Sequence, residues 1–243
     1  MIDQQGFVIS RHWRDCRQGV ELEYWLSTDD GPVQILIPSQ QAVLFLTVAE
    51  SKQAQQLLLQ NQSAWRRELR PLKTFDHEPV EAFYFQQQRQ LRHSEQRLQQ
   101  AGLNPLESDI KPSDRYLMER FVRGSLRFRG AVSHKRAGFR QLIDPAVMAG
   151  SYLPQLKVLS LDIETAMTGI NLYSIGVYAK QGDCVTSKVF MRSVDTVDSD
   201  DYESGEVLDI DCYADERSLL HGFFDWLAEF DPDVIIGWNV INF

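Results

Sequence analysis

The chain has 243 residues, a net charge of −9 and 43% hydrophobic residues, values typical of a globular protein that builds its own core. No apolar run in the sequence is long enough to cross a bilayer, and the first residues lack the basic and apolar stretches of a secretory signal. The three cysteines have no metal-ligand spacing, and an odd number of them favours a reducing compartment. We therefore expect a cytoplasmic protein that does not contact a membrane.

Charge is distributed unevenly along the chain. Residues 120–140 contain eight basic side chains, counting one histidine, and no acidic ones, whereas residues 191–243 contain 14 acidic side chains against two arginines. Such a split indicates one part that contacts phosphates and another that repels them or holds cations. A solvated linker surface is the alternative interpretation of the basic run.

The first half of the chain predicts a mixed α+β domain. Asp30-Gly31 separates two apolar runs, which is typical of a tight hairpin. Ser113 or Asp114 is the expected cap of the third of three helices. The predicted strands are 6–13, 20–26, 33–37, 43–48, 69–72 and 80–85, and the predicted helices are 50–61, 86–100 and 111–122.

Residues 124–154 change character. Four glycines and two prolines interrupt this stretch, which shows no sustained hydrophobic period. We expect a linker here and a domain boundary near residue 150, so that one domain spans 1–150 and the next spans 151–243.

The second domain is expected to be α/β. Residues 157–163 form a continuous apolar run of the kind buried inside a sheet, and an amphipathic helix is predicted over 214–230. The other expected strands are 172–179, 184–191 and one beginning at 234. An acidic loop is expected at 195–211. Three strands, a helix and a strand predict a mixed sheet with at least one crossover.

Two carboxylates stand at the end of the first strand of this domain. Because side chains alternate along a strand, Asp162 and Glu164 project from the same face, about 7 Å apart. Carboxylate oxygens at this spacing suit hard cations such as Mg²⁺ or Mn²⁺, and without a cation the two charges repel each other. The spacing alone is weak evidence for a metal site, since an Asp-x-Glu sequence occurs by chance about once in a chain of this length.

A second cluster near residue 243 makes the pattern specific. Leu161-Asp162-Ile163-Glu164-Thr165 resembles the first exonuclease motif of family B DNA polymerases, and Asp231 through Asn239, followed by Phe243, is similar to the approach to their second motif. Within the family, the chain is most similar to the bacterial polymerase II branch. The likeness extends upstream to Gly6-Phe7, Arg11 through Asp15, and Arg115 through Phe121.

The resemblance implies a fold and a site. The fold is an α+β amino-terminal domain followed by a partial α/β RNase H-like exonuclease domain with a mixed sheet. Asp162 and Glu164 are implied to be catalytic residues that hold two ions, Mg²⁺ or Mn²⁺. Asn239 and Phe243 are implied to contact the primer 3′ end, and Thr165 is a weaker candidate for the same contact.

The resemblance also implies an activity and partners. These are DNA-directed DNA synthesis with 3′→5′ proofreading in replication and repair, on a primer 3′ end and a template strand. The other polymerase domains, and a sliding clamp reached through a carboxyl-terminal part, are the implied protein partners. The sequence stops one position before the family's second catalytic Asp, so we expect the chain by itself to be inactive.

Other functions are consistent with the same residues. The amino-terminal domain could be a module that binds template or single-stranded DNA through Arg127, Arg129 and Arg136. It could instead be a scaffold between catalytic domains, or the chain could belong to a nuclease that is not a polymerase.

Trp238 is expected in the core, because an indole buries a large apolar area.

Overall fold

The computed structural model of the chain describes residues 1–59, 65–136, 138–167, 171–193, 209–238 and 240. The chain divides into two compact units, Met1–Pro154 and Gln155–Phe243. None of the described helices is long and apolar enough to cross a membrane.

The first unit is built around a seven-stranded sheet. The predicted hairpin at Asp30-Gly31 is confirmed: Gly31 has a φ of +92°, which glycine adopts without strain, and its N–H donates to the carbonyl of Thr28 over 3.1 Å. In spatial order the strands are β10 (Ala146–Ala149), β7 (Ser125–Gly130), β1 (Ile2–Cys16), β2 (Gly19–Ser27), β3 (Val33–Gln40), β9 (Phe139–Ile143) and β8 (Val132–Arg136).

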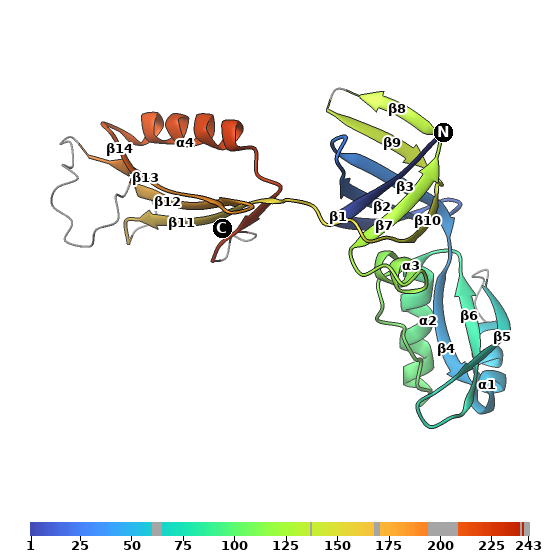
Figure 1. Cartoon of the computed structure of the whole chain (residues 1–243). Coiled ribbons are helices and arrows are strands. Elements are labelled where there is room, and N and C mark those ends of the chain that lie inside the picture. The colour runs from blue at the N-terminus through green and yellow to red at the C-terminus, as the bar shows by residue number, and fades with distance from the viewer. Residues whose placement is uncertain (60–64, 137, 168–170, 194–208, 239, 241–243) are drawn as a thin grey trace. The chain divides into compact units, whose positions relative to one another are not determined.

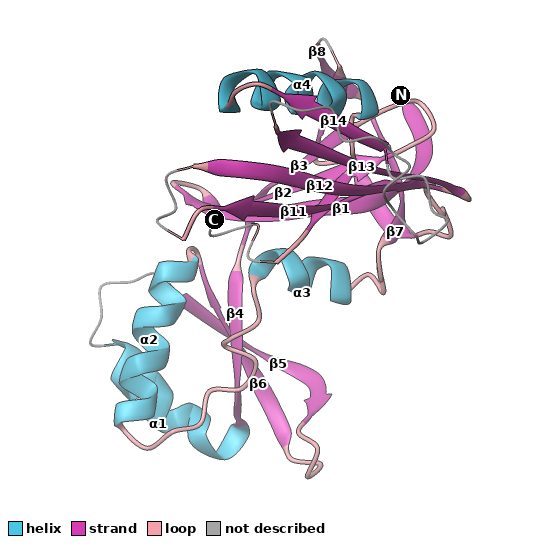
Figure 2. Ribbon diagram, turned by 90° about the vertical axis from the view of Figure 1, so that its left-hand side faces the viewer, coloured by secondary structure: helices cyan, strands magenta, loops and turns pink. Residues whose placement is uncertain are grey.

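A three-stranded sheet and two helices form the other part of this unit (Figure 2). Helices α1 (Val48–Leu59) and α2 (Gln88–Gln100) lie beside this sheet, and a third helix, α3 (Pro112–Met118), follows them in the chain. The strands are, in spatial order, β4 (Ala42–Thr47), β6 (Pro79–Phe85) and β5 (Trp65–Lys73).

One hydrophobic core joins both sheets of the first unit. Alternate residues of β2 and β3 point into it, which is the period expected of strands with one buried face. Its fully buried large side chains include Leu22, Tyr24, Leu26, Ile35, Ile37, Leu44, Leu46, Leu58, Phe83, Phe85 and Phe128.

The start of α2 combines a local capping box, formed by Gln87 and Gln90, with a contact from a distant strand. The carboxylate of Asp15, in β1, accepts hydrogen bonds from the backbone N–H groups of Gln88 and Arg89, over 2.7 and 3.0 Å, at the start of α2. The prediction that Ser113 or Asp114 caps α3 was wrong. Lys111 occupies the cap position and Pro112 the first helical position, where a missing N–H costs no helical hydrogen bond.

The expected linker at 124–154 is instead mostly sheet, with β7 to β10 inside it. Three of its four glycines lie close to other residues of the first unit. At Gly150, for example, an added Cβ would lie 2.7 Å from the backbone carbon of Leu126. The prediction failed because these strands are only four to six residues long, too short to display a period.

The second unit has a mixed five-stranded sheet with one helix, α4 (Glu216–Phe230), over one face (Figure 1). The mixed sheet was predicted and is confirmed. Strand β14 was not predicted, because its first three residues belonged to the acidic loop expected at 195–211. In spatial order the strands are β14 (Asp209–Tyr213), β13 (Cys184–Arg192), β12 (Leu172–Gln181), β11 (Lys157–Thr165) and β15 (Val234–Ile236). Strand β11 is antiparallel to β12 and parallel to β15.

The core of the second unit lies between α4 and the sheet. Phe190 is fully buried and its ring lies 5.6 Å from that of Phe223 and 5.9 Å from that of Trp226, both on α4. The side chain of Asp215 accepts a 2.8 Å hydrogen bond from the N–H of Ser218, which caps the helix at its start. The helix therefore covers one face of the sheet, and no described helix covers the other (Figure 1).

Candidate functional site

The two carboxylates lie on the uncovered face of the second unit's sheet. Leu159 is buried in the core, and Leu161 and Ile163 pack against it, so the alternate residues point the other way. Asp162 and Glu164 are accordingly exposed near the carboxyl end of β11. Their Cα atoms lie about 7 Å apart, as expected for residues two positions apart in a strand.

No described residue neutralises either carboxylate. Neither Asp162 nor Glu164 forms a hydrogen bond or an ion pair within the described part of the chain. Across the ladder, Asp162 pairs with Gly176 and Glu164 pairs with Ser174, so no cation stands directly opposite them. Two unpaired carboxylates on one exposed face fit the oxygen ligands that Mg²⁺ and Mn²⁺ prefer.

Among the described residues, Asp162 and Glu164 are the only candidate metal ligands at this site. Among the residues that the structure describes, no group of three or more His, Cys, Asp or Glu side chains is arranged to hold a metal ion. Asp162 and Glu164 fit as two ligands of such a site, and any further ligand comes from outside the described residues or from solvent.

The second sequence motif reaches the same end of β11. Strand β15 pairs with β11 up to Ser160 and Ile236, and Gly237 follows directly. A Cβ added to Gly237 would lie 2.3 Å from the carbonyl oxygen of Leu161, so only glycine fits this approach. The segment after β15 therefore crosses the backbone one residue before Asp162.

The other residues predicted for this site have different outcomes. Thr165 is half-buried as the last residue of β11, where the register against β12 shifts. Asn239 and Phe243 lie outside the described residues. The prediction that Trp238 is a core residue was wrong: its side chain is 93% exposed, because the chain leaves the sheet after Ile236.

Part of the basic run is paired within the first unit. Arg127 donates to both carboxylate oxygens of Asp3 over 2.7 Å, and this hydrogen bond lowers the pKa of Asp3. Arg140 bonds to Gln4 and Thr28. Arg129 is exposed on the same face of β7 as Arg127, whereas the side chain of Arg136 lies outside the description.

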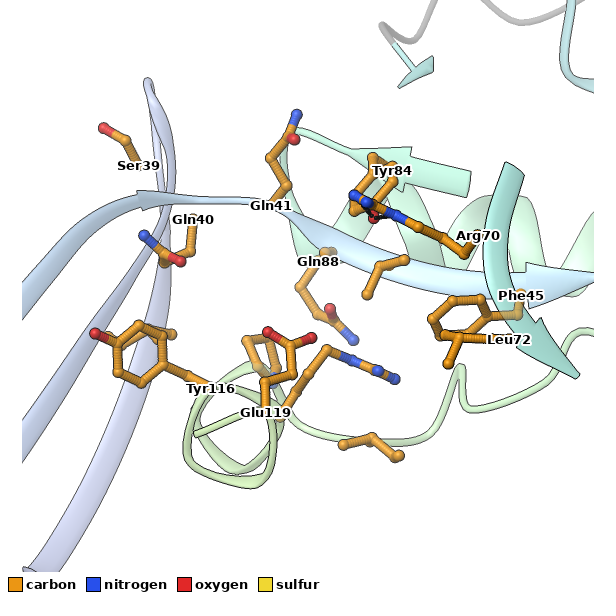
Figure 3. A pocket seen from close by; sticks show the side chains of 16 residues that line it. Ser39, Gln40, Gln41, Phe45, Arg70, Leu72, Tyr84, Gln88, Tyr116 and Glu119 are labelled. Carbon is orange, nitrogen blue, oxygen red and sulfur yellow. Dashed lines mark hydrogen bonds between the residues drawn. The ribbon is translucent and has the colours of Figure 1, made fainter. Parts of the chain in front are cut away.

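A cavity of about 480 Å³ lies in the first unit between the three-stranded sheet and α3 (Figure 3). Gln88 projects into it and is 3% exposed, and its amide nitrogen has no hydrogen-bond partner among the described residues. Arg70 and Arg115 line the wall; Arg70 donates two hydrogen bonds to the hydroxyl of Tyr84, over 3.0 and 2.8 Å. No local pattern in the sequence indicates this cavity, because its lining comes from seven separate elements, β2 to β6, α2 and α3, and from loops beside them.

Comparison with known proteins assigns the chain to a family. A family model described as "DNA polymerase family B, exonuclease domain" matches residues 106–243, and models of the N-terminal and insertion domains of DNA polymerase II match residues 6–41 and 42–103. The chain belongs to DNA polymerase family B. The resemblance seen in the sequence is thereby confirmed.

Individual relatives agree with this assignment. The chain is 36% identical over 240 residues to DNA polymerase II of Escherichia coli (strain K12), a match that covers 99% of this chain and 29% of that protein. It is 26% identical over 123 residues to the DNA polymerase zeta catalytic subunit of Arabidopsis thaliana, covering 46% of this chain and 6% of that one. The chain thus spans less than a third of the length of these relatives.

A solved structure shows the same fold. The family B DNA polymerase from the hyperthermophilic archaeon Pyrobaculum calidifontis matches with a TM-score of 0.65 and 18% identity, over 98% of this chain and 31% of that one. The predicted fold class, an α+β amino-terminal domain followed by an exonuclease-type domain, is confirmed by this likeness and by the family match.

Proposed function

We propose that this chain is the amino-terminal part of a DNA-directed DNA polymerase with a 3′→5′ proofreading exonuclease, acting in replication and repair. One observation carries the nuclease proposal. Two exposed carboxylates, Asp162 and Glu164, have no partner in the described part of the chain and lie on the sheet face of a family B exonuclease domain that no described helix covers. The likeness to a protein named DNA polymerase II supports the polymerase proposal.

Asp162 and Glu164 would hold two divalent ions, Mg²⁺ or Mn²⁺. Held by these two carboxylates, such ions would supply Lewis-acid activation of a water and charge stabilisation at the leaving 3′ oxygen. Asn239 and Phe243 are proposed to position the terminal nucleotide of the primer, with Thr165 as a weaker third contact. A strand would reach the carboxylates from the sheet face that no described helix covers, since α4 occupies the other face.

We expect the 243-residue chain by itself to have no exonuclease activity, because two carboxylates hold two ions incompletely. The test is Mn²⁺-dependent release of a 3′ label from single-stranded DNA, by this chain and by the product of the complete gene. Release by the gene product that is abolished by Asp162→Ala supports the proposal. Release that survives Asp162→Ala contradicts it, and release by the 243-residue chain contradicts the expected inactivity.

A second candidate function is that the first unit contacts template or single-stranded DNA. The buried, unpaired amide of Gln88 beside two arginines favours a ligand that accepts hydrogen bonds. Exposed Arg129 offers a charge for phosphate, whereas Arg127 already pairs with Asp3.

Salt dependence tests this second candidate. DNA affinity that falls steeply with salt, and falls less steeply in Arg129→Gln, supports DNA binding, because each phosphate contact releases counterions. Arg127→Gln is the matched control on the same strand and is expected to change the slope less. Absence of DNA binding at low salt would favour a scaffold role for this unit.

We infer in addition that the other polymerase domains are this chain's protein partners, with a sliding clamp reached through a carboxyl-terminal part, and that the protein acts in the cytoplasm. The length of the relatives supports the first of these inferences, because the match covers 29% of DNA polymerase II of Escherichia coli.

A further inference from the structure

Helix α3 is followed by a phenylalanine whose backbone lies in the left-handed region. The N–H of Val122 donates to the carbonyl of Leu117 over 2.9 Å, and the N–H of Phe121 donates to the carbonyl of Met118 over 3.0 Å. These two hydrogen bonds make the Schellman ending of a helix, in which the residue at the position of Phe121 takes a positive φ. Its φ is +56°, and glycine is the residue usually found at such a position.

Phenylalanine is an unusual residue for this conformation, because a positive φ is strained for any residue with a Cβ and most of all for a bulky one. Phe121 is the one apolar residue among the six described residues other than glycine that have a positive φ. The other five are polar: Ser39, His77, Glu107, Asp144 and Asp231.

The ring of Phe121 does not offset this strain by packing. Its side chain is 85% exposed, so it adds little buried apolar area to the first unit. The fold of this unit therefore gives no reason for phenylalanine in place of glycine. Strain that the fold does not require indicates a role in binding.

Basic side chains accompany Phe121 in the sequence. It is the second residue of the basic run, residues 120–140, which contains no acidic residue. The guanidinium carbon of Arg120 lies 3.5 Å from the centroid of the Tyr116 ring, and this guanidinium also donates to the carbonyl of Tyr116 over 3.1 Å. Arg123 is exposed, and within the described part of the chain it forms no hydrogen bond or ion pair.

An exposed ring in a run of basic residues fits single-stranded DNA. Bases stack on aromatic side chains whatever their sequence, and the backbone beside them carries one negative charge per nucleotide. Residues two positions apart lie at most about 7 Å apart, so Arg123 is near enough to reach a phosphate beside a base on Phe121. The strained backbone keeps the ring out of the core, and the ring is therefore ready to stack without rearrangement.

We propose that Phe121 is a platform on which one base of single-stranded DNA stacks, while Arg123 contacts a phosphate beside that base. This inference rests on the second proposed function, DNA binding by the first unit, and it names residues that perform it. The partner is a strand with unpaired bases, because a base inside a duplex has no free face for the ring.

The test compares a strand that has bases with a strand that has none. Fluorescence anisotropy measures the affinity of the 243-residue chain for a short labelled oligothymidylate and for an abasic strand with the same number of phosphates. The variant is Phe121→Leu, and the matched control is Phe75→Leu. Phe75 is also exposed in the first unit, but Asp76 and Glu78 are near it in the sequence instead of arginines.

Affinity for the oligothymidylate should fall by about tenfold in Phe121→Leu, because one base loses its aromatic partner. It should stay unchanged in Phe75→Leu and in Phe121→Trp, which keeps an aromatic ring. Affinity for the abasic strand should not change in any of these three variants. Arg123→Gln should weaken binding of both strands and make the salt dependence less steep.

A glycine variant separates binding from folding. Phe121→Gly relieves the left-handed strain, so the melting temperature should stay equal or rise. Its affinity for the oligothymidylate should fall at least as far as that of Phe121→Leu. A lower melting temperature with unchanged affinity would show that the ring supports the fold, and it would overturn the inference.

Other outcomes also overturn it. Equal oligothymidylate affinity in the parent and in Phe121→Leu would exclude stacking on this ring while leaving DNA binding by the first unit intact. A parent chain that binds neither strand at low salt would contradict DNA binding itself and, with it, the inference. In the product of the complete gene, a Phe121→Leu variant that loses stability but keeps its DNA affinity would show that another domain covers the ring, against the inference.

Discussion

At the scale of a single residue, Gly237 brings the second sequence motif, residues 231–243, into contact with the first, residues 161–165. Its backbone approaches the carbonyl of Leu161 so closely that an added Cβ would lie 2.3 Å from that oxygen. Backbone atoms on both sides must shift to relieve such an overlap. The position of Asp162, the next residue, depends on this contact.

Gly237→Ala is expected to destabilise the second unit by about 1–3 kcal/mol, the usual cost of forcing an extra carbon into a packed region. It should also weaken Mn²⁺ binding, because the backbone beside Asp162 moves. Thermal unfolding and calorimetric titration measure the two effects. Gly176→Ala is the matched control, since its Cβ meets nothing closer than 4.0 Å. Equal behaviour of the two variants would refute the role of this contact.

Asp215 gives the second unit an acid-dependent contribution to stability. The hydrogen bond from the N–H of Ser218 lowers the pKa of this carboxyl group below its ordinary value of 3.8. A lowered pKa in the folded state stabilises the fold at higher pH, and the contribution is lost as the pH falls below about 4. Melting temperatures measured from pH 6 to pH 3 should fall less in Asp215→Asn than in the parent chain. Parallel pH profiles would contradict this.

Single residues were predictable from the sequence only where local periodicity governs them. Strand alternation predicts that Asp162 and Glu164 share a face, and the structure has both exposed opposite the core. The functional role of this pair stays a prediction. The packing of Gly237 against Leu161 joins residues distant in sequence, so no local pattern indicates it.

At the scale of elements, the packing of α4 on the sheet holds the second unit together. Phe190, in β13, is fully buried against two aromatic rings of α4. Phe190→Ala should lower the free energy of unfolding by about 3–5 kcal/mol, because it removes a ring and leaves a cavity. Val185→Ala, at a 49% exposed position of the same strand, should change it by less than about 0.5 kcal/mol. Denaturant unfolding measures both, and similar losses would contradict this packing.

Long elements with a clear period were predicted well, and short ones were not. The apolar strand at 157–163 and the amphipathic helix at 214–230 correspond to β11 and α4. Strands β7 to β10 were mistaken for a linker, because runs of four to six residues are stabilised by pairing with distant strands. The start of α2 likewise depends on Asp15, more than 70 residues earlier in the chain.

At the scale of the whole molecule, two hydrophobic cores underlie two compact units. No residue belongs to both cores among those that the structure describes. We therefore expect scanning calorimetry to resolve two unfolding transitions, of which Phe190→Ala lowers only one. A single transition that Phe190→Ala shifts as a whole would show that the units unfold as one.

The central claim is that Asp162 and Glu164 form a divalent metal site on the uncovered sheet face. The most direct measurement is a calorimetric titration of Mn²⁺ into the 243-residue chain and into its Asp162→Ala, Glu164→Ala double variant. We predict weak binding by the parent chain, because two carboxylates are an incomplete ligand set, and no binding by the double variant. Equal binding by both chains, or no binding by either, would contradict the claim.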